Sequence, residues 1–326
     1  MKISDIVALG LWPDSKKTTS KKGLSELEEL GYNLFYIGKN ADLYTCPSEE
    51  AKVLLVRSDR SSVFDIPLNL EIEGKGIFQT TISNNGALFA KESGIRTAIL
   101  SETIDQSLAI APRCQLMELC KPLEATIDGE VVQFELIYRN YLTGSLFDAC
   151  QSGNDPYGLN LPSGLKQWHK FETPIFTPTT KGLKDEPLNS AKVRELFPEI
   201  VTSLEKLFND FTIFAENRGI IVVDTKFEIF VNSKGEWVLG DEVLTPESSR
   251  FISKEDFEAQ NFISMDKQIL RDFGKANDWK EKAKSLKSGE KLEVNVPQEI
   301  KDKANMITTS LDDDGIYHAF KELNLI

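Results

Sequence analysis

The chain has few of the residues that bind soft metals or form disulfide frameworks. It contains two histidines and four cysteines in 326 residues. The cysteines, Cys46, Cys114, Cys120 and Cys150, do not show Cys-x-x-Cys spacing. This pattern favours reduced, structural cysteines over a metal site or a disulfide scaffold. With so few histidines, histidine-based catalysis is not expected.

Long apolar runs are missing as well. The apolar stretch of MKISDIVALGLWPDSKK is interrupted by Asp5 and Gly10 and is too short for a secretory signal. No segment reaches about 18 apolar residues, the length that marks a candidate for crossing a bilayer. Together with the cysteine pattern, these features predict a cytoplasmic protein without a membrane partner.

A concentrated block of basic residues is a third absence. The chain has 38 basic and 51 acidic side chains, a net charge of −13. Such a surface repels polyanions unless its cations cluster, so nucleic acid is not an expected partner. A small phosphorylated ligand remains compatible with this charge, because two or three local cations can bind it.

The length predicts two lobes, because single cores usually stop growing below this size and a domain takes about 150 residues. Residues 1–120 are expected to form a mainly antiparallel β lobe. It begins with the strand-like segments YNLFYIG, ADLYTC and KVLLVRS. Residues 121–326 are expected to form a larger mixed lobe with a helical C-terminal region. Whether that region packs on the second lobe or at a subunit contact is left open.

Local signals place several elements between and within these lobes. Helical periodicity is visible at residues 87–92, and Asp128-Gly129 predicts a hairpin. Residues 151–187 are rich in Gly, Pro, Ser and Thr and predict a long functional connection. From Ser190 to Arg218 the apolar spacing is helical, and Gly219 ends it.

The segment VDTKFEIF (residues 223–230) raises the first functional question. In a strand, alternation sends Asp224, Lys226 and Glu228 to one face and the residues between them to the other. One face is therefore charged and the other packed. An exposed face with weak ion pairs, worth about 0 to 1 kcal/mol, is the alternative to a functional site.

The returning segment EWVLGDE adds Asp241 to this argument. A two-residue loop at Lys234 and Gly235 would place Asp241 opposite Glu228, and a four-residue loop would place it opposite Lys226. Both registers put Asp241 on the charged face, whereas an odd-residue loop would turn it away. Two carboxylates and a lysine on one face could hold a hard cation and a phosphate.

The next turn, in GDEVLTPESSRF (residues 240–251), supplies donors able to bind an anion: Thr245, Ser248, Ser249 and Arg250. A second candidate cation is Arg139, which ends the apolar strand VVQFELIY. A buried arginine there would need an anionic partner.

These residues resemble a known family. VDTKFEIF followed by GDEVLTPESSRF is similar to the signature region of phosphoribosylaminoimidazole-succinocarboxamide (SAICAR) synthetases of purine biosynthesis. Similar blocks occur in the same order, from about Tyr36 to Phe273. They are FYIGKNADLY, SDRSSVFD with EGKG, YRNYLTGS, PIFTPTTKG with the following DEP, and MDKQILRDF.

The resemblance implies a two-lobed α+β fold, with a β-rich first lobe, a mixed α/β second lobe similar to ATP-grasp enzymes, and ATP between them. It implies a ligase that joins carboxyaminoimidazole ribonucleotide to L-aspartate, giving SAICAR, ADP and phosphate. A carboxylate is a poor electrophile, so the implied route passes through an acyl phosphate. Catalysis then depends on aligning and neutralising several anions.

The resemblance also implies roles for individual residues. Mg²⁺ on the ATP phosphates would be held by Glu228 and Asp241, and the phosphates would be approached by Lys39, with Lys75 as a further cation. The ribonucleotide 5′-phosphate would be bound by Arg139, Ser145, Ser249 and Arg250. The pocket around the reacting carboxylate would be lined by Asp224, Lys226, Lys181 and Asp185.

The chain departs from the family pattern in a few positions. Ala41 stands where a second basic residue is usual, which would weaken ATP binding unless another cation such as Lys75 replaces it. Glu247 stands in place of Asp, and Lys184 in place of His. Two alternatives therefore remain open: a diverged ligase for a related carboxylated nucleotide or amine, and a nucleotide-binding regulatory homologue. The sequence also leaves a homo-oligomer open.

Overall fold

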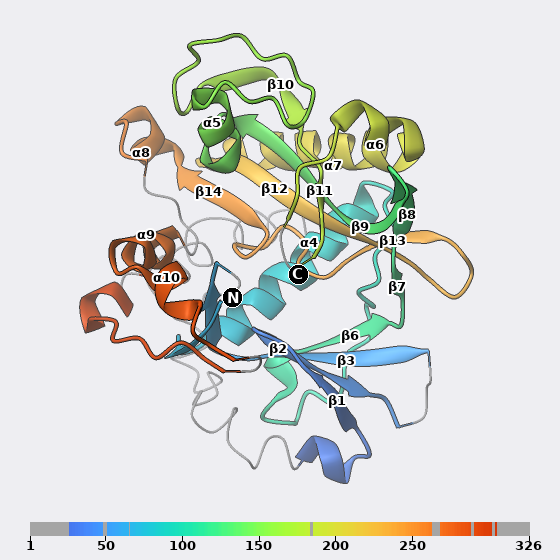
Figure 1. The fold of residues 1–326 in the computed structure, drawn as a ribbon. Helices are drawn as coiled ribbons and strands as arrows, with labels where there is room; N and C mark the ends of the chain where they lie inside the picture. Colours follow the sequence, from blue (N-terminus) through green and yellow to red (C-terminus); the bar gives the residue numbers. More distant parts are fainter. Residues whose placement is uncertain are drawn as a thin grey trace.

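The computed structural model describes residues 26–47, 51–64, 66–182, 185–262, 268–287, 290–301 and 304. They form two main sheets with a long helix between them (Figure 1). The strand pairs of the sheets are antiparallel wherever the structure describes them. The expected α+β class is confirmed.

The first main sheet has four strands in the order β1-β2-β3-β6. They are β1 (Asn33–Ile37), β2 (Ala41–Thr45), β3 (Lys52–Arg57) and β6 (Cys114–Glu118), and a 3-10 turn at Ala111–Arg113 precedes β6. In β3, Val53 and Leu55 face the main core, whereas Leu54 and Val56 face a smaller one. Burial on both faces explains why KVLLVRS is almost continuously apolar.

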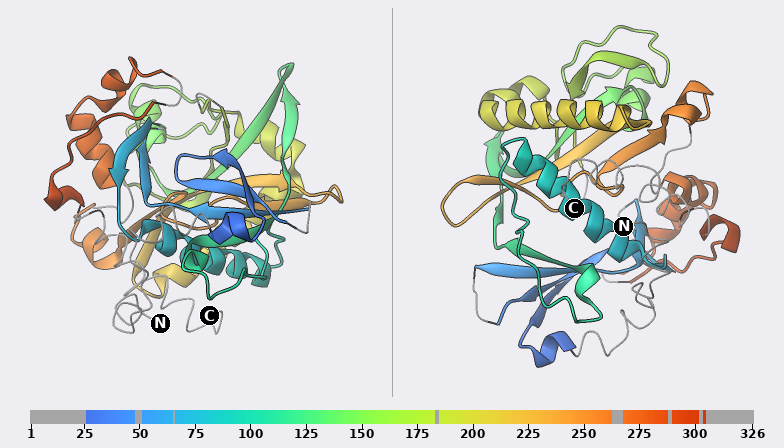
Figure 2. Two further views of the ribbon diagram at one scale, coloured as in Figure 1. Left: turned by 90° about the horizontal axis from the view of Figure 1, so that it is seen from below. Right: turned by 180° about the vertical axis from the view of Figure 1, so that it is seen from behind.

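Helix α4 (Lys75–Glu92) crosses the molecule between the two main sheets (Figures 1 and 2). Its start is held by Asp59, whose carboxylate accepts hydrogen bonds from the backbone N–H groups of Gly74 and Gly76 and pairs with Arg113. The sequence predicted only the end of this helix. Its first turns contact protein on several sides and carry buried polar residues. They therefore show no simple apolar stripe from which a helix could be predicted.

The second main sheet has eight strands built around β9 (Glu130–Tyr141) and β12 (Ile220–Val231). The flanking strands are β7 (Lys121–Pro122), β8 (Glu124–Ile127), β10 (Lys170–Phe176), β11 (Thr179–Thr180), β13 (Trp237–Gly240) and β14 (Ser249–Ser253). β12 pairs with β7, β9, β13 and β14. Strands β10 and β11 lie within residues 151–187, so this expected connection contains regular structure.

A register shift in the β12–β14 pairing lies between Val222 and Asp224. Val222 and Phe227 pack in the main core, although their positions differ in parity along the strand. The irregularity therefore reverses the alternation and turns Asp224, Lys226 and Glu228 away from that core. Bulges of this kind often lie next to active sites, where they redirect side chains.

The two expected hairpins have different outcomes. The Asp-Gly hairpin is confirmed, because Ile127 pairs with Glu130 and both turn residues have positive φ. In the β12–β13 hairpin, Val231 pairs with Trp237 and Glu228 pairs with Gly240. Both predicted registers are wrong, because the loop spans residues 232–236 and has an odd length.

Helices α6 (Ser190–Leu196) and α7 (Pro198–Glu216) cover the core face of the second sheet, as Figure 2 shows from behind. Leu204, Leu207, Phe208 and Phe211 are fully buried there. The expected helix is divided at Phe197, since Pro198 lacks the N–H that would continue the hydrogen-bond ladder. On another part of the sheet lie α5 (Gly144–Gln151) and α8 (Lys254–Glu258).

The C-terminal helices pack on a hairpin from the first part of the chain. Helices α9 (Gln268–Ala276) and α10 (Trp279–Ala283) share a core with β4 (Arg60–Val63) and β5 (Ile66–Glu71). These helices therefore pack on residues of the expected first lobe, and a subunit contact stays a prediction. The domain boundary near residue 120 stays a prediction. Among the described residues, no helix is long and apolar enough to span a membrane.

Candidate active site

The charged face of β12 forms ion pairs with the adjacent strand β9. Lys226 Nζ lies 2.9 Å from Glu228 Oε1 and 2.7 Å from Glu135 Oε1. Glu228 also pairs with Lys181. Burial opposes the charge on Lys226, but Glu228 and then Glu135 outweigh it and raise the pKa of the lysine. The weak, exposed ion pairs of the alternative interpretation do not describe this cluster, because Glu228 and Glu135 are both buried.

The position of Asp241 does not follow from strand alternation. Strand β13 ends at Gly240, and Asp241 has a left-handed φ of 56°. Burial, followed by repulsion from Glu228 and Glu242, raises the pKa of Asp241 to about 7. Asp241 directly follows Gly240, which pairs with Glu228, so the two residues are neighbours across the β12–β13 hairpin.

These two carboxylates form a donor set suited to a hard cation. Mg²⁺ in proteins is commonly held by one or two carboxylates together with substrate phosphates and water. Within the described part of the chain, no three histidine, cysteine or acidic side chains form a group that could hold a metal. Glu228 and Asp241 supply two carboxylates for such a set, and in this structure the Glu228 oxygens are paired with Lys226 and Lys181.

A second charged group lies further along β12. Asp224 pairs with Arg139 on β9 and with Arg250 on β14, so three neighbouring strands contribute to it. Asp224 accepts from Arg139 Nη1 at 2.7 Å and from Arg250 Nε at 2.8 Å. Burial disfavours the carboxylate, but Arg250 and then Arg139 outweigh it and hold the pKa of Asp224 below its usual value.

The first turn of α5 lies beside Arg250. A Cβ added at Gly144, whose φ is 60°, would lie 3.1 Å from Nη1 of Arg250. Ser145 is exposed in the same turn, and Arg139 is held by Thr177 Oγ1 at 2.8 Å. Two guanidinium groups beside the N–H groups of a helix start form an arrangement suited to a phosphate.

Ser249 does not lie with these arginines. Its hydroxyl is buried and accepts a hydrogen bond of 3.1 Å from Thr225, whose position is on the packed face of β12. The structure therefore separates Ser249 from the other three expected phosphate ligands.

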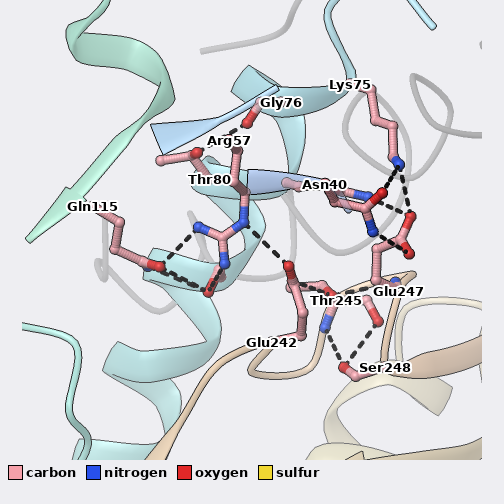
Figure 3. Close-up of polar contacts among 12 residues, drawn as sticks. Asn40, Arg57, Lys75, Gly76, Thr80, Gln115, Glu242, Thr245, Glu247 and Ser248 are labelled. Atoms are coloured by element: carbon pink, nitrogen blue, oxygen red, sulfur yellow. Dashed lines mark hydrogen bonds and ion pairs between the residues drawn. The ribbon is translucent and has the colours of Figure 1, made fainter. Parts of the chain in front are cut away.

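The predicted nucleotide lysines differ in exposure. Lys39 is exposed in the β1–β2 turn. Lys75 is 6% exposed at the start of α4, with its Nζ 3.0 Å from Glu247 Oε1 (Figure 3). Lys75 is thus engaged in an internal ion pair, and its role as the cation that replaces the one missing at Ala41 stays a prediction. Asp185 is exposed four residues after Lys181, in the segment that follows β11.

Glu135 is the site residue that the sequence interpretation missed. It stands directly opposite Glu228 in the β9–β12 pairing. A signal for it was present, because Glu135 and Arg139 are four residues apart in one strand and must share a face. Burial raises the pKa of Glu135, with Lys226 opposing and Glu228 adding to the effect.

Comparison with known proteins decides the family. The family model for SAICAR synthetase matches residues 34–286 of this chain. The chain belongs to the SAICAR synthetase family. A phosphoribosylaminoimidazole-succinocarboxamide synthase of Desulfotalea psychrophila is 33% identical over 264 residues, which is 76% of this chain and 85% of the relative.

Solved structures of the SAICAR synthetase family share the fold. The SAICAR synthase of Saccharomyces cerevisiae, complexed with SAICAR, superposes with a TM-score of 0.66 at 27% identity, covering 90% of this chain and 95% of that one. A type-2 SAICAR synthetase in complex with ADP gives a TM-score of 0.56 at 22% identity, covering 80% and 100%. The expected SAICAR synthetase-like fold is confirmed, and the family makes this chain a ligase of purine biosynthesis.

Proposed function

We propose that the chain joins the carboxylate of carboxyaminoimidazole ribonucleotide to the amine of L-aspartate, with conversion of ATP to ADP and phosphate. The observation that carries this proposal is the arrangement of β12. An anion-binding arginine pair lies at one end of its charged face and a lysine–carboxylate cluster at the other. We place the reaction in the cytoplasm, in agreement with the cysteine pattern.

The ribonucleotide 5′-phosphate would bind at the arginine end. Arg139, Arg250 and Ser145 would contact it, with the N–H groups of the first turn of α5. Asp224 would keep both guanidinium groups oriented, since it already accepts hydrogen bonds from each. Arginine suits this task because its planar fork binds two phosphate oxygens at once. The yeast relative solved with SAICAR supports a ribonucleotide in this fold.

ATP would bind between the sheets with its phosphates at the other end. Glu228 and Asp241 would hold Mg²⁺, which neutralises phosphate charge when bound. Lys39 would approach the phosphates from the β1–β2 turn. The structure of this fold in complex with ADP is consistent with a nucleotide substrate.

The reacting carboxylate would lie near Lys226, Lys181 and Asp185. Phosphorylation of its oxygen by ATP forms an acyl phosphate and releases ADP. The amine of aspartate would then attack the acyl carbon and form the C–N bond. The C–O bond to the phosphate breaks, the phosphate leaves with its electron pair, and the nitrogen gives up one proton. Carboxylate neighbours raise the pKa of both lysines, which keeps them positively charged beside these anions.

The decisive experiment is a coupled ADP-release assay with carboxyaminoimidazole ribonucleotide and ATP, with and without L-aspartate. Aspartate-dependent release that yields SAICAR supports the proposal. Release that requires another amine would instead support a diverged ligase. ATP binding without release would support the regulatory alternative. Ala41 favours that alternative, because it puts no basic side chain at this position. Its partner across β2 and β3 is Arg57, which is buried and paired with Glu242.

A further inference from the structure

Helix α4 contacts the turn formed by residues 242–248. Lys75 and Gln79, one turn apart, both contact Glu247. Further along the same helix, a Cβ added at Gly86 would lie 2.3 Å from the carbonyl oxygen of Val243. Since this distance leaves no room for a side chain, α4 and the turn are in direct contact.

The Glu247 carboxylate connects that turn with two segments near the first sheet (Figure 3). Its Oε1 lies 3.0 Å from Lys75 Nζ and accepts a hydrogen bond of 3.0 Å from Gln79 Nε2. Its Oε2 accepts from Asn40 Nδ2 at 3.3 Å. Glu247 and Lys75 each have 7% of the side chain exposed. Asn40 directly follows Lys39 in the β1–β2 turn.

Hydrogen bonds continue from Glu247 toward Asp241. The backbone N–H of Glu247 donates to Thr245 Oγ1 at 3.2 Å, and that hydroxyl donates to Glu242 Oε2 at 2.7 Å. Glu242 directly follows Asp241, and its other oxygen accepts from Arg57 Nε at 3.2 Å. A continuous set of contacts therefore joins the turn that carries Lys39 to the residue after Asp241.

We propose that Glu247 is a positioning residue for the nucleotide, which fixes the Lys39 turn relative to the Asp241 carboxylate. The inference rests on the proposed function, in which these two residues approach the ATP phosphates from opposite sides. Lys75 neutralises Glu247 and does not itself contact the phosphates. An aspartate at this position would be shorter by one bond, about 1.5 Å. It would keep the negative charge but lose the contact with Asn40.

The test compares Glu247→Gln, Glu247→Asp and Asn40→Ala with the wild-type protein. MgADP binding is measured by calorimetry, and KM is measured separately for ATP and for the ribonucleotide. We expect Glu247→Gln to raise the Kd for MgADP about tenfold, since it removes a charge-assisted contact. Glu247→Asp should restore part of the loss, and the ribonucleotide KM should stay within about twofold.

Glu102→Gln is the matched control, because Glu102 pairs with Lys52 on the surface. An unchanged Kd for MgADP in Glu247→Gln and Asn40→Ala, with only a lower Tm, overturns the inference. So does an equal rise in KM for both substrates, or a wild-type protein that does not bind MgADP. Wild-type MgADP binding without aspartate-dependent turnover contradicts the proposed reaction, and in that case the calorimetry still decides the role of Glu247.

Discussion

Asp224 Oδ2 accepts a hydrogen bond of 2.7 Å from Nη1 of Arg139 across the β9–β12 pairing. The same carboxylate accepts from Arg250 on the opposite side. Two arginines that would otherwise repel each other are therefore held side by side around one buried anion. Breaking such a group by removing one charge costs far more than breaking a surface pair.

Asp224→Asn should lower the free energy of unfolding by about 3 kcal/mol at pH 7, because the buried guanidinium of Arg139 and the partly buried one of Arg250 lose their counter-charge. The pKa of Asp224 is held below its usual 3.8. A lowered folded-state pKa gives stability that is fully present above pH 3.8 and is lost as the pH falls through the folded pKa. Urea unfolding at pH 7 and at pH 3 should show the difference shrinking at the lower pH.

The control for this variant is Asp128→Asn, which breaks an exposed pair with Lys192. It should change the free energy of unfolding by no more than about 0.5 kcal/mol. Equal losses in the two variants at pH 7 would show that the buried arginine group contributes nothing special.

Arg250→Ala should raise the KM for the ribonucleotide about 10- to 100-fold, since charge-assisted bonds to a phosphate are lost. The KM for ATP should change little, because Arg250 lies at the other end of the β12 face from Glu228. Steady-state kinetics on the folded variant measure both values. Arg250→Lys should not restore binding, because one ammonium cannot replace the bidentate fork. An unchanged ribonucleotide KM would rule out the phosphate role.

Glu228→Ala and Asp241→Ala should each abolish Mg·ATP-dependent ADP release while the fold is retained. Each variant removes one of the two carboxylates expected to hold the cation. ADP release and circular dichroism measure activity and folding. Glu236→Ala, in the same hairpin but on an exposed pair with Arg96, should keep its activity. Full turnover by a folded double variant would contradict the metal assignment.

Asp241→Asn should stabilise the nucleotide-free protein above pH 7. The pKa of Asp241 is raised from 3.8 to about 7, so the folded state holds an extra proton between these values. Stability then falls as the pH rises through that window. Tm measured from pH 4 to pH 8 should show the variant gaining on the wild type as the pH increases. Parallel Tm curves would mean that Asp241 ionises normally.

The sequence predicted the charged face of β12 and strands β1, β2 and β3 of the first sheet, because alternation and turn residues are local properties. Lys226 and Glu228 lie together as period two requires. Arg139 also has the anionic partner that burial of its charge demanded. That partner is Asp224, which lies two residues before Lys226 on β12, whereas Glu228 lies two residues after it.

Other parts of the site depend on information that local patterns do not contain. The place of Asp241 follows from an odd-length loop combined with a left-handed residue, and each of these alone would have given a different answer. The Lys75–Glu247 pair joins residues far apart in the chain. No periodicity in either segment indicates its partner, so only the folded arrangement reveals it.

Strand β12 also sets the distance between the two charged groups of the site. Asp224 and Glu228 lie four residues apart on it, and a strand advances about 3.3 Å per residue, so the two ends of the site are separated by roughly 13 Å. Pairing with β9 along this whole stretch makes the separation difficult to change. In the proposed reaction, a ribonucleotide whose 5′-phosphate and reacting carboxylate do not match this separation would not reach both ends.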